Sequence, residues 1–239
     1  MNRAAFFDID GTLTEKPSLE RRYFRALRRE GKISFRNGIT WLAEAARLAP
    51  SGLPYALQGN KAYLRAIRSS GLRANRAGDD APFFPEAVEA VARHAANGER
   101  IVLVTGTLEF LADAIAQRLR AELLKRNVSA EIHVCATRLE ERDGRWTGRI
   151  LRQPMFGEVK AIALWWYAEK WKLNLAECSA YGDGGLDEWM LASAGNPVAV
   201  NPDSRLCAAA RRRGWEIVNW AQAVRPKAKL AKMVPESAR

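Results

Sequence analysis

Cysteine is scarce in this sequence, with only Cys135, Cys178 and Cys207 among 239 residues. Three cysteines so far apart cannot build a disulfide framework, and none belongs to the closely spaced pairs that form structural zinc sites. We therefore expect reduced thiols in a cytosolic protein.

Long hydrophobic runs are also lacking. None approaches the roughly 20 residues that a membrane-spanning helix needs, and the apolar start of the chain meets Asp8 too early for a signal peptide. There is no internal repeat and no long low-complexity segment. Because 48% of the residues are hydrophobic and 27% are charged, a sizeable core can form. Collagen-like, transmembrane and wholly disordered chains are excluded, and a cytoplasmic location is expected.

Positive charge is abundant, since 38 Lys and Arg against 27 Asp and Glu give a net charge of +11. This excess favours acidic partners such as phosphorylated substrates, nucleic acid or anionic lipid, but it does not choose among them. The last residues, 225–239, hold five basic residues and one acidic residue, and we expect a flexible basic tail there.

Short apolar segments alternate with amphipathic ones along most of the chain. The short segments predict buried strands at residues 4–7, 101–104, 132–135, 178–181, 198–200 and 217–218. The longer ones predict helices at residues 85–97, 108–126, 159–172, 186–193 and 204–213. This alternation predicts an α/β fold: a Rossmann-like, doubly wound parallel sheet with helices on both faces, whose ligands bind at the carboxyl ends of the strands.

The alternation is interrupted after the first strand, where more than eighty residues lack a convincing strand. Helices are predicted instead at 18–30, 37–48 and 60–70. We expect a helical cap domain at 15–82, inserted into a core domain formed by 1–14 and 83–224.

A second interruption lies at residues 137–150, where two short segments flank Asp143 and Gly144. The segments are 137–140 and 146–150, and Asp-Gly between alternating runs predicts a small β-hairpin.

The first polar cluster, Asp8-Ile9-Asp10-Gly11-Thr12, directly follows the first strand. Asp8 and Asp10 can both reach one cleft while Gly11 permits the turn. Two such close carboxylates repel each other unless a cation or a shared proton compensates. Mg²⁺ is the natural compensator, because it takes oxygen ligands and pairs carboxylates with substrate phosphate. An Asp-rich turn that caps a helix is the alternative.

Three further groups follow later strands or begin helices. Thr105 and Gly106 end a strand before a helix, whose free N–H groups would form a cradle for an oxyanion. Lys160 begins a helix, where a nearby anion would rationalise its charge. Asp183 and Asp187 follow another strand within a Gly-rich turn. Taken one at a time, these groups have ordinary structural explanations. Thr105 could be a helix cap, Lys160 a solvated surface lysine, and Asp183 and Asp187 turn or cap residues.

In combination and in this order, the motifs resemble the haloacid-dehalogenase-like phosphohydrolases. The resemblance covers roughly residues 3–220. The insertion after the first motif is similar to the cap of the phosphoserine-phosphatase-like branch, subfamily IB. Residues 137–150, 156–160 and 195–203 are also similar to bacterial members of that branch.

The resemblance implies a mechanism through an aspartyl-phosphate. Asp8 would be the nucleophile, and Asp10 would protonate the leaving group and then activate water. Mg²⁺ would be held by the Asp8 carboxylate, the Asp10 backbone carbonyl, Asp183 and a substrate oxygen, with Asp187 orienting its bound waters. The phosphate-binding residues would be Thr105, Gly106 and Lys160. They would give hydrogen bonds and positive charge to the phosphoryl oxygens.

The substrate is less clear from the sequence. Residues 15–81 hold fourteen basic and six acidic residues, and most of these basic side chains should be solvated. Phosphoserine phosphatases bind the substrate amine through a cap glutamate. At the corresponding spacing this chain has Pro17, flanked by Glu15 and Glu20. We expect a small phosphorylated metabolite. A phospholipid or nucleic-acid phosphate, a phosphotransferase reaction and a binding module without catalysis are the alternatives.

Overall fold

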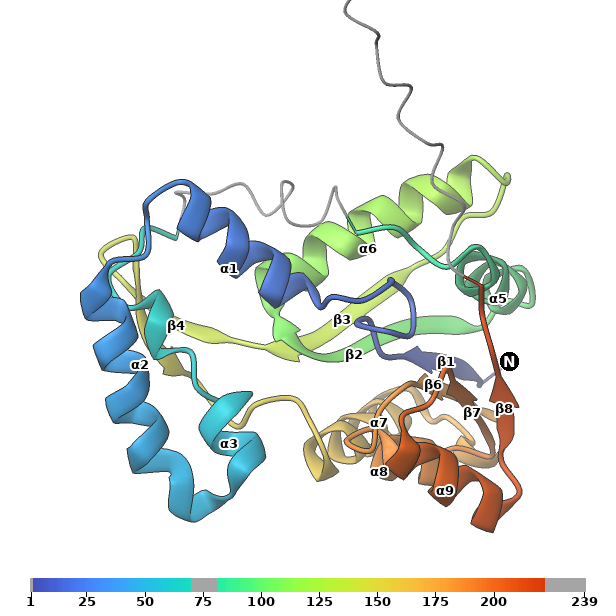
Figure 1. Cartoon of the computed structure of the whole chain (residues 1–239). Helices are drawn as coiled ribbons and strands as arrows, with labels where there is room; N and C mark the ends of the chain where they lie inside the picture. Colours follow the sequence, from blue (N-terminus) through green and yellow to red (C-terminus); the bar gives the residue numbers. More distant parts are fainter. Residues whose placement is uncertain (1, 70–80, 222–239) are drawn as a thin grey trace, which may run out of the picture.

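The computed structural model describes residues 2–69 and 81–221. Its centre is a six-stranded, all-parallel sheet in the order β3-β2-β1-β6-β7-β8 (Figure 1). The strands are β1 (Ala4–Phe7), β2 (Arg100–Leu108), β3 (Ile132–Thr137), β6 (Ser179–Gly182), β7 (Asn196–Val200) and β8 (Glu216–Val218). The predicted doubly wound α/β fold is confirmed. The predicted basic tail, 225–239, lies outside the described residues.

Helices cover both faces of the sheet because successive strand residues point to opposite sides. Phe7 packs in a cluster with α5 (Pro85–Ala96) and α6 (Glu109–Leu124). Phe6 packs on the other face with α7 (Glu158–Trp171), α8 (Glu188–Ala192) and α9 (Ser204–Arg213). These two groups lie above and below the sheet in Figure 1. Both clusters consist of fully buried apolar side chains, which fixes the strand ends against the helices.

The segment inserted after β1 is mainly helical. It contains α1 (Leu19–Arg29), α2 (Phe35–Leu48), α3 (Leu53–Leu57) and the 3₁₀ turns η1 (Ala49–Ser51) and η2 (Ala62–Leu64). α1 begins at the N-cap Ser18 and buries a stripe of Leu19, Tyr23 and Leu27 in the same cluster as Phe7. The segment lies beside the carboxyl ends of β1 and β2 (Figure 1).

The predicted hairpin is confirmed as β4 (Leu139–Arg142) and β5 (Arg145–Ile150). Asp143 and Gly144 both have positive φ (51° and 68°), as the tight hairpin turn requires. Thr137, expected in the first arm, instead ends β3. The hairpin forms a separate two-stranded sheet.

The hairpin also explains why the helix predicted at 60–70 is wrong for its described part. After η2 the chain extends and pairs with β5 instead of coiling. The Ala66 N–H donates to the Trp146 carbonyl, and the Trp146 N–H donates to the Ile67 carbonyl. Arg68 and Arg145 form an antiparallel bridge. Pairing with a distant strand overrides the local helical pattern.

No helix within residues 2–69 and 81–221 is both long enough and apolar enough to cross a membrane.

Candidate active site

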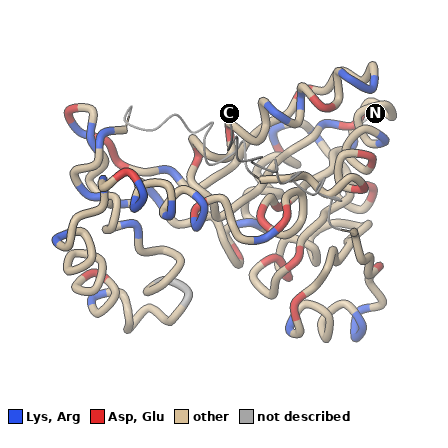
Figure 2. The backbone as a smooth tube through the Cα atoms, turned by 45° about the horizontal axis from the view of Figure 1, so that its top comes forward, with Lys and Arg blue, Asp and Glu red and all other residues tan. Residues whose placement is uncertain are grey.

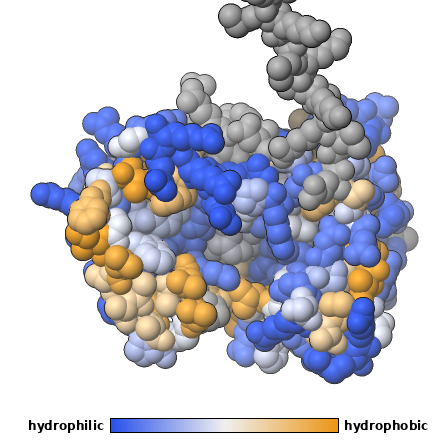
Figure 3. Space-filling view, in the orientation of Figure 1, coloured by the Kyte–Doolittle hydropathy of each residue, from blue (hydrophilic) through white to orange (hydrophobic). Residues whose placement is uncertain are grey.

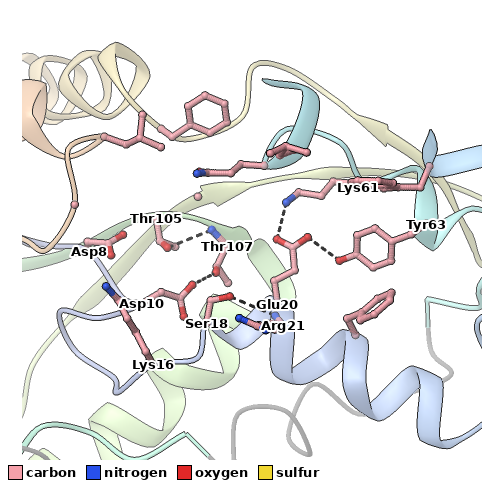
Figure 4. Close-up of a pocket in the computed structure, with 18 of the residues that line it drawn as sticks. Asp8, Asp10, Lys16, Ser18, Glu20, Arg21, Lys61, Tyr63, Thr105 and Thr107 are labelled. Carbon is pink, nitrogen blue, oxygen red and sulfur yellow. Dashed lines mark hydrogen bonds and ion pairs between the residues drawn. The ribbon is translucent and has the colours of Figure 1, made fainter. Parts of the chain in front are cut away.

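Three neighbouring strands deliver the predicted site residues to one place. Asp8 follows β1, Thr105 lies in β2 and Asp183 follows β6, and these strands are adjacent in the order β2-β1-β6. A cavity of about 1550 Å³ opens at their carboxyl ends (Figure 4). It also includes Asp10 and Lys160 in its lining. The parallel topology therefore brings together residues that are up to 175 positions apart in the sequence.

Asp8, Asp183 and Asp187 form a buried acidic triad. One carboxylate oxygen from each lies within 4.8 Å of the other two, and the three residues are 5%, 6% and 3% exposed. Gly11 makes room for this cluster, because a Cβ at that position would lie 2.2 Å from Asp183 Oδ2. Mg²⁺ takes oxygen ligands, commonly one or two carboxylates together with water and substrate phosphate, and this triad can supply those carboxylates. The residues present therefore fit a divalent cation.

The charges of this triad are costly to hold together. Burial raises the pKa of Asp8 well above its usual range, and the neighbouring aspartates add to the rise while Lys160 opposes it. Burial, with the charge of Asp187, raises the pKa of Asp183 to about 6. A cation bound among these oxygens would offset the repulsion and favour the ionised carboxylates.

Lys160 brings a buried positive charge to the acidic triad. Its Nζ lies 2.6 Å from Asp8 Oδ1 and 2.5 Å from Asp187 Oδ1. Burial alone would lower the pKa of this lysine, but the charges of Asp187 and Asp8 outweigh burial and raise it. Lys160 is held in the first turn of α7, whose N-cap is Gly157 at φ 60°. It therefore stays protonated beside Asp8.

Asp187 is fixed by the turn that also carries Asp183. Its Oδ2 accepts hydrogen bonds from the backbone N–H groups of Asp183 (3.2 Å) and Gly184 (3.0 Å). Its other oxygen meets Lys160. Asp187 thus joins the third strand end to the lysine.

The carboxylate of Asp10 points away from the triad, toward the inserted segment. Its Oδ1 accepts from the Leu19 N–H at 2.8 Å, and its Oδ2 accepts a short hydrogen bond from the Thr107 hydroxyl. Burial raises the pKa of Asp10, and these two hydrogen bonds oppose the rise. Both carboxylate oxygens of Asp10 are therefore engaged by hydrogen bonds, and Asp10 is not part of the acidic triad.

The expected helix-start cradle at Thr105 and Gly106 is wrong in its secondary structure. β2 continues to Leu108, and α6 begins only at Glu109. Thr105 and Gly106 belong to the strand, although the register of β2 against β3 shifts between Thr105 and Leu108. Buried Thr105 accepts a hydrogen bond from the Thr107 N–H through its hydroxyl and lines the cavity together with Gly106.

Sequence reasoning missed Thr107 and Lys16. The Thr-Gly-Thr run contains Thr107, but nothing local pairs it with Asp10, 97 residues away. Lys16 Nζ lies 2.8 Å from Asp183 Oδ2 although its side chain is 66% exposed. A lysine in a turn is indistinguishable by sequence from a solvated one.

Glu20 on α1 faces the cavity but is already paired. Its Oε2 lies 2.5 Å from Nζ of buried Lys61, and its Oε1 accepts from the Tyr63 hydroxyl at 2.6 Å (Figure 4). Burial and the charge of Glu20 raise the pKa of Tyr63, so the phenol stays a donor. Glu15 is buried and does not line this cavity. The charge of the Glu20 carboxylate, one of the two that flank Pro17 in the sequence, is therefore neutralised within the protein by Lys61.

Comparisons with known proteins find chains that are similar in sequence and in fold. The family model for haloacid dehalogenase-like hydrolases matches residues 5–192. The phosphoserine phosphatase SerB1 of Mycobacterium tuberculosis is 30% identical over 229 residues, which span 91% of this chain and 70% of the relative.

Solved structures share the fold. A protein of unknown function from Bordetella pertussis Tohama I is 28% identical with a TM-score of 0.72, over 91% of this chain and 98% of that one. A phospho-aspartyl intermediate analogue of phosphoserine phosphatase is 19% identical with a TM-score of 0.61, over 90% and 91%.

Proposed function

We infer the function from the premise that this chain belongs to the haloacid dehalogenase-like hydrolase family. We propose that it is a Mg²⁺-dependent phosphomonoester hydrolase that works through an aspartyl-phosphate. The convergence of Asp8, Asp183, Asp187 and Lys160 carries this proposal, because it joins the ends of the adjacent strands β1 and β6 to the start of α7.

Asp8 is the proposed nucleophile. A carboxylate ionised at neutral pH attacks phosphorus without a base, and Lys160 at 2.6 Å favours that ionised form. Attack forms the Asp8–phosphorus bond and breaks the bond from phosphorus to the ester oxygen. Water then attacks the phosphorus and releases inorganic phosphate and the Asp8 carboxylate.

Asp10 is the proposed proton carrier. Its raised pKa lets it hold a proton for the leaving alkoxide, and the Leu19 and Thr107 hydrogen bonds orient it. After the alcohol leaves, the ionised Asp10 accepts a proton from the attacking water. One group serves both half-reactions because they are chemical reverses of each other.

The remaining residues are proposed to hold Mg²⁺ and to stabilise the negative charge of the phosphoryl oxygens. Asp8 and Asp183, with the Asp10 backbone carbonyl, would hold Mg²⁺, and Asp187 would orient the waters around it. When bound, Mg²⁺ supplies positive charge to the phosphoryl oxygens and lets the acids coexist. Thr105, Gly106 and Lys160 would contact the same oxygens.

The organic part of the substrate is proposed to lie under the inserted segment. We treat residues 15–82 as a cap domain over a core of 1–14 and 83–224. Because Glu20 is paired with Lys61 and Tyr63, it cannot also serve as a free partner for a substrate amine. This argues against phosphoserine and for an ester without an ammonium group at that position.

A phosphate-release screen over phosphorylated metabolites tests this function. We expect turnover with Mg²⁺, none with EDTA, and recovery when Mg²⁺ is restored. Asp8→Asn should lose turnover while circular dichroism shows an intact fold. Asp10→Asn should slow catalysis by about 10²–10⁴-fold. Turnover by Asp8→Asn near the wild-type rate would contradict the proposal. Competing alcohols in the assay would reveal phosphoryl transfer in place of hydrolysis.

A further inference from the structure

The site cavity has two chemically different ends. The catalytic end holds the aspartates, Thr105 and Lys160, and the end formed by the inserted segment combines charged and polar side chains such as Arg21, Arg28 and Lys61 with five large apolar ones. These are Phe24, Ile33, Phe35, Trp41 and Leu57. The volume of about 1550 Å³ exceeds the roughly 300–1,000 Å³ typical of small-molecule sites. Phe24, Ile33 and Trp41 pack partly against the core, and a short polar metabolite would leave the exposed side chains of Phe35 and Leu57 uncovered.

The apolar surface continues outside the cavity. Phe35, Ile39 and Leu42 repeat at helical spacing on α2 and are 85%, 51% and 63% exposed. On α3, Leu53 and Leu57 are 70% and 49% exposed. Figure 3 shows hydrophobic residues gathered over α2 and α3. Phe35 and Leu57 belong to both the cavity and this surface, so the two are continuous. We call these five residues the cap apolar face.

Basic side chains flank this face. Arg21, Arg25, Arg28 and Arg29 on α1 are exposed, and Arg21 and Arg28 also line the cavity. In Figure 2, the backbone of the inserted segment carries more basic positions, in blue, than acidic ones, in red. Glu20 is paired with Lys61, and Glu44 on α2 with Arg47. An amphipathic helix with basic neighbours is the pattern of a segment that lies in an anionic membrane interface.

From this continuity, and resting on the proposed function, we propose that the substrate is a lipid phosphomonoester and that the cap apolar face docks on the anionic membrane that holds it. The phosphate reaches the acidic triad, and the apolar chain lies against Phe24, Phe35 and Trp41. The hydrolysed bond is the ordinary phosphomonoester bond: water enters, and inorganic phosphate and the lipid alcohol leave.

The docking test uses the full chain and vesicles of phosphatidylcholine with phosphatidylglycerol, which contain no phosphomonoester. We expect sedimentation with these vesicles, and weaker binding at high salt because the arginine attraction is screened. Ile39→Ser/Leu42→Ser should weaken binding at least about tenfold. Leu124→Ser/Ile162→Ser is the matched control, since these residues are 63% and 61% exposed on α6 and α7. Circular dichroism verifies folding of both variants.

The substrate test compares 1-oleoyl glycerol 3-phosphate with glycerol 3-phosphate. We expect kcat/KM to be higher for the oleoyl ester, by about tenfold for every two methylene groups that become buried. Ile39→Ser/Leu42→Ser should lower kcat/KM for the vesicle-borne ester and leave glycerol 3-phosphate unchanged, because neither residue lines the cavity.

The outcomes separate this inference from the proposed function. Equal kcat/KM for the two esters, or no vesicle binding, would overturn the lipid inference while Asp8-dependent phosphate release still stands. If the wild type sediments as a dimer without binding vesicles, and Ile39→Ser/Leu42→Ser sediments as a monomer, the cap apolar face binds a second copy of the chain. That outcome would also overturn the lipid inference. Vesicle binding without any phosphatase activity would overturn the proposed function and the lipid substrate with it, leaving only the membrane docking.

Discussion

Lys160 holds together charges that would otherwise repel. The residue is 3% exposed, and its ammonium contacts both Asp8 and Asp187. Removing one partner of a buried ion pair leaves an uncompensated charge, which costs more than the pair itself contributes.

We expect Lys160→Met to lower the free energy of unfolding by about 3 kcal/mol in EDTA, because two buried carboxylates lose their counter-charge. Urea denaturation measures this change. The control is Lys170→Met, at an exposed position in the last turn of α7. Mg²⁺ should recover part of the loss. An unchanged unfolding midpoint would show that Asp8 and Asp187 do not depend on this contact.

His94 does not belong to the acidic triad and gives a separate, pH-dependent contribution to stability. Its Nδ1 lies 2.8 Å from Glu99 and its Nε2 lies 2.9 Å from the Tyr181 hydroxyl. Burial lowers the pKa of His94, and Glu99 opposes this. The unfolded chain therefore binds the proton more readily, so stability is lost as the pH falls below about 6.5 and through the folded pKa.

We expect the wild type to lose more stability than His94→Gln between pH 7.5 and pH 5. The difference between the two proteins isolates the histidine, because the buried aspartates of raised pKa change in both. Thermal unfolding across this pH range in EDTA provides the measurement. Parallel pH curves for the two proteins would contradict the prediction.

Among the elements, the strands that carry the site were predictable, but the end of β2 and the partners of the site side chains were not. The apolar runs that precede Asp8, Thr105 and Asp183 identify three parallel strands, and parallel strands end at one edge. The partners of Asp10 and Glu20 depend on where α1 and η2 pack, which no local pattern encodes. The helix expected at 60–70 failed for the same reason, because β5 pairs with that segment.

Gly148 marks where the hairpin meets the inserted segment. It has φ 82°, and a Cβ there would lie 2.9 Å from Ala62 Cα and 3.3 Å from the Lys61 carbonyl. Gly98 has φ 72° and open space around it, so it offers a control for the backbone strain alone.

We expect Gly148→Ala to destabilise the protein more than Gly98→Ala, for which the left-handed backbone costs about 1–2 kcal/mol. Gly148→Ala should also raise KM, because displacement of Lys61 disturbs its contact with Glu20 at the cavity. Denaturant unfolding and steady-state kinetics test both effects. Equal destabilisation by the two substitutions would rule out a tight contact at Ala62.

At the scale of the whole molecule, the net charge of +11 is distributed unevenly. The catalytic end of the cavity concentrates buried acids, while basic side chains flank the inserted segment. The sequence predicted the excess of basic residues but not their placement beside an apolar surface. The exposure of Phe35, Ile39 and Leu42 depends on how α2 packs in the fold, which the local sequence does not encode.

We expect Mg²⁺ to raise the unfolding temperature of the whole chain. At one hundred times its Kd a ligand stabilises the folded state by about 2.7 kcal/mol, which corresponds to about 5–10 °C for a chain of this size. Differential scanning calorimetry of the wild type, Asp183→Asn and the exposed control Asp113→Asn tests this. An equal shift for Asp183→Asn would place the ion elsewhere.

The hydrogen bond from the Leu19 N–H to Asp10 joins the first residue of α1 to the proposed proton carrier. A ligand that pushes α1 outward would loosen this bond and misalign the proton at the ester oxygen. A phosphate ester that enters the cleft but leaves α1 displaced would then be held without being cleaved quickly. Discrimination between substrates would arise in the rate of bond breaking as well as in binding, through a single amide.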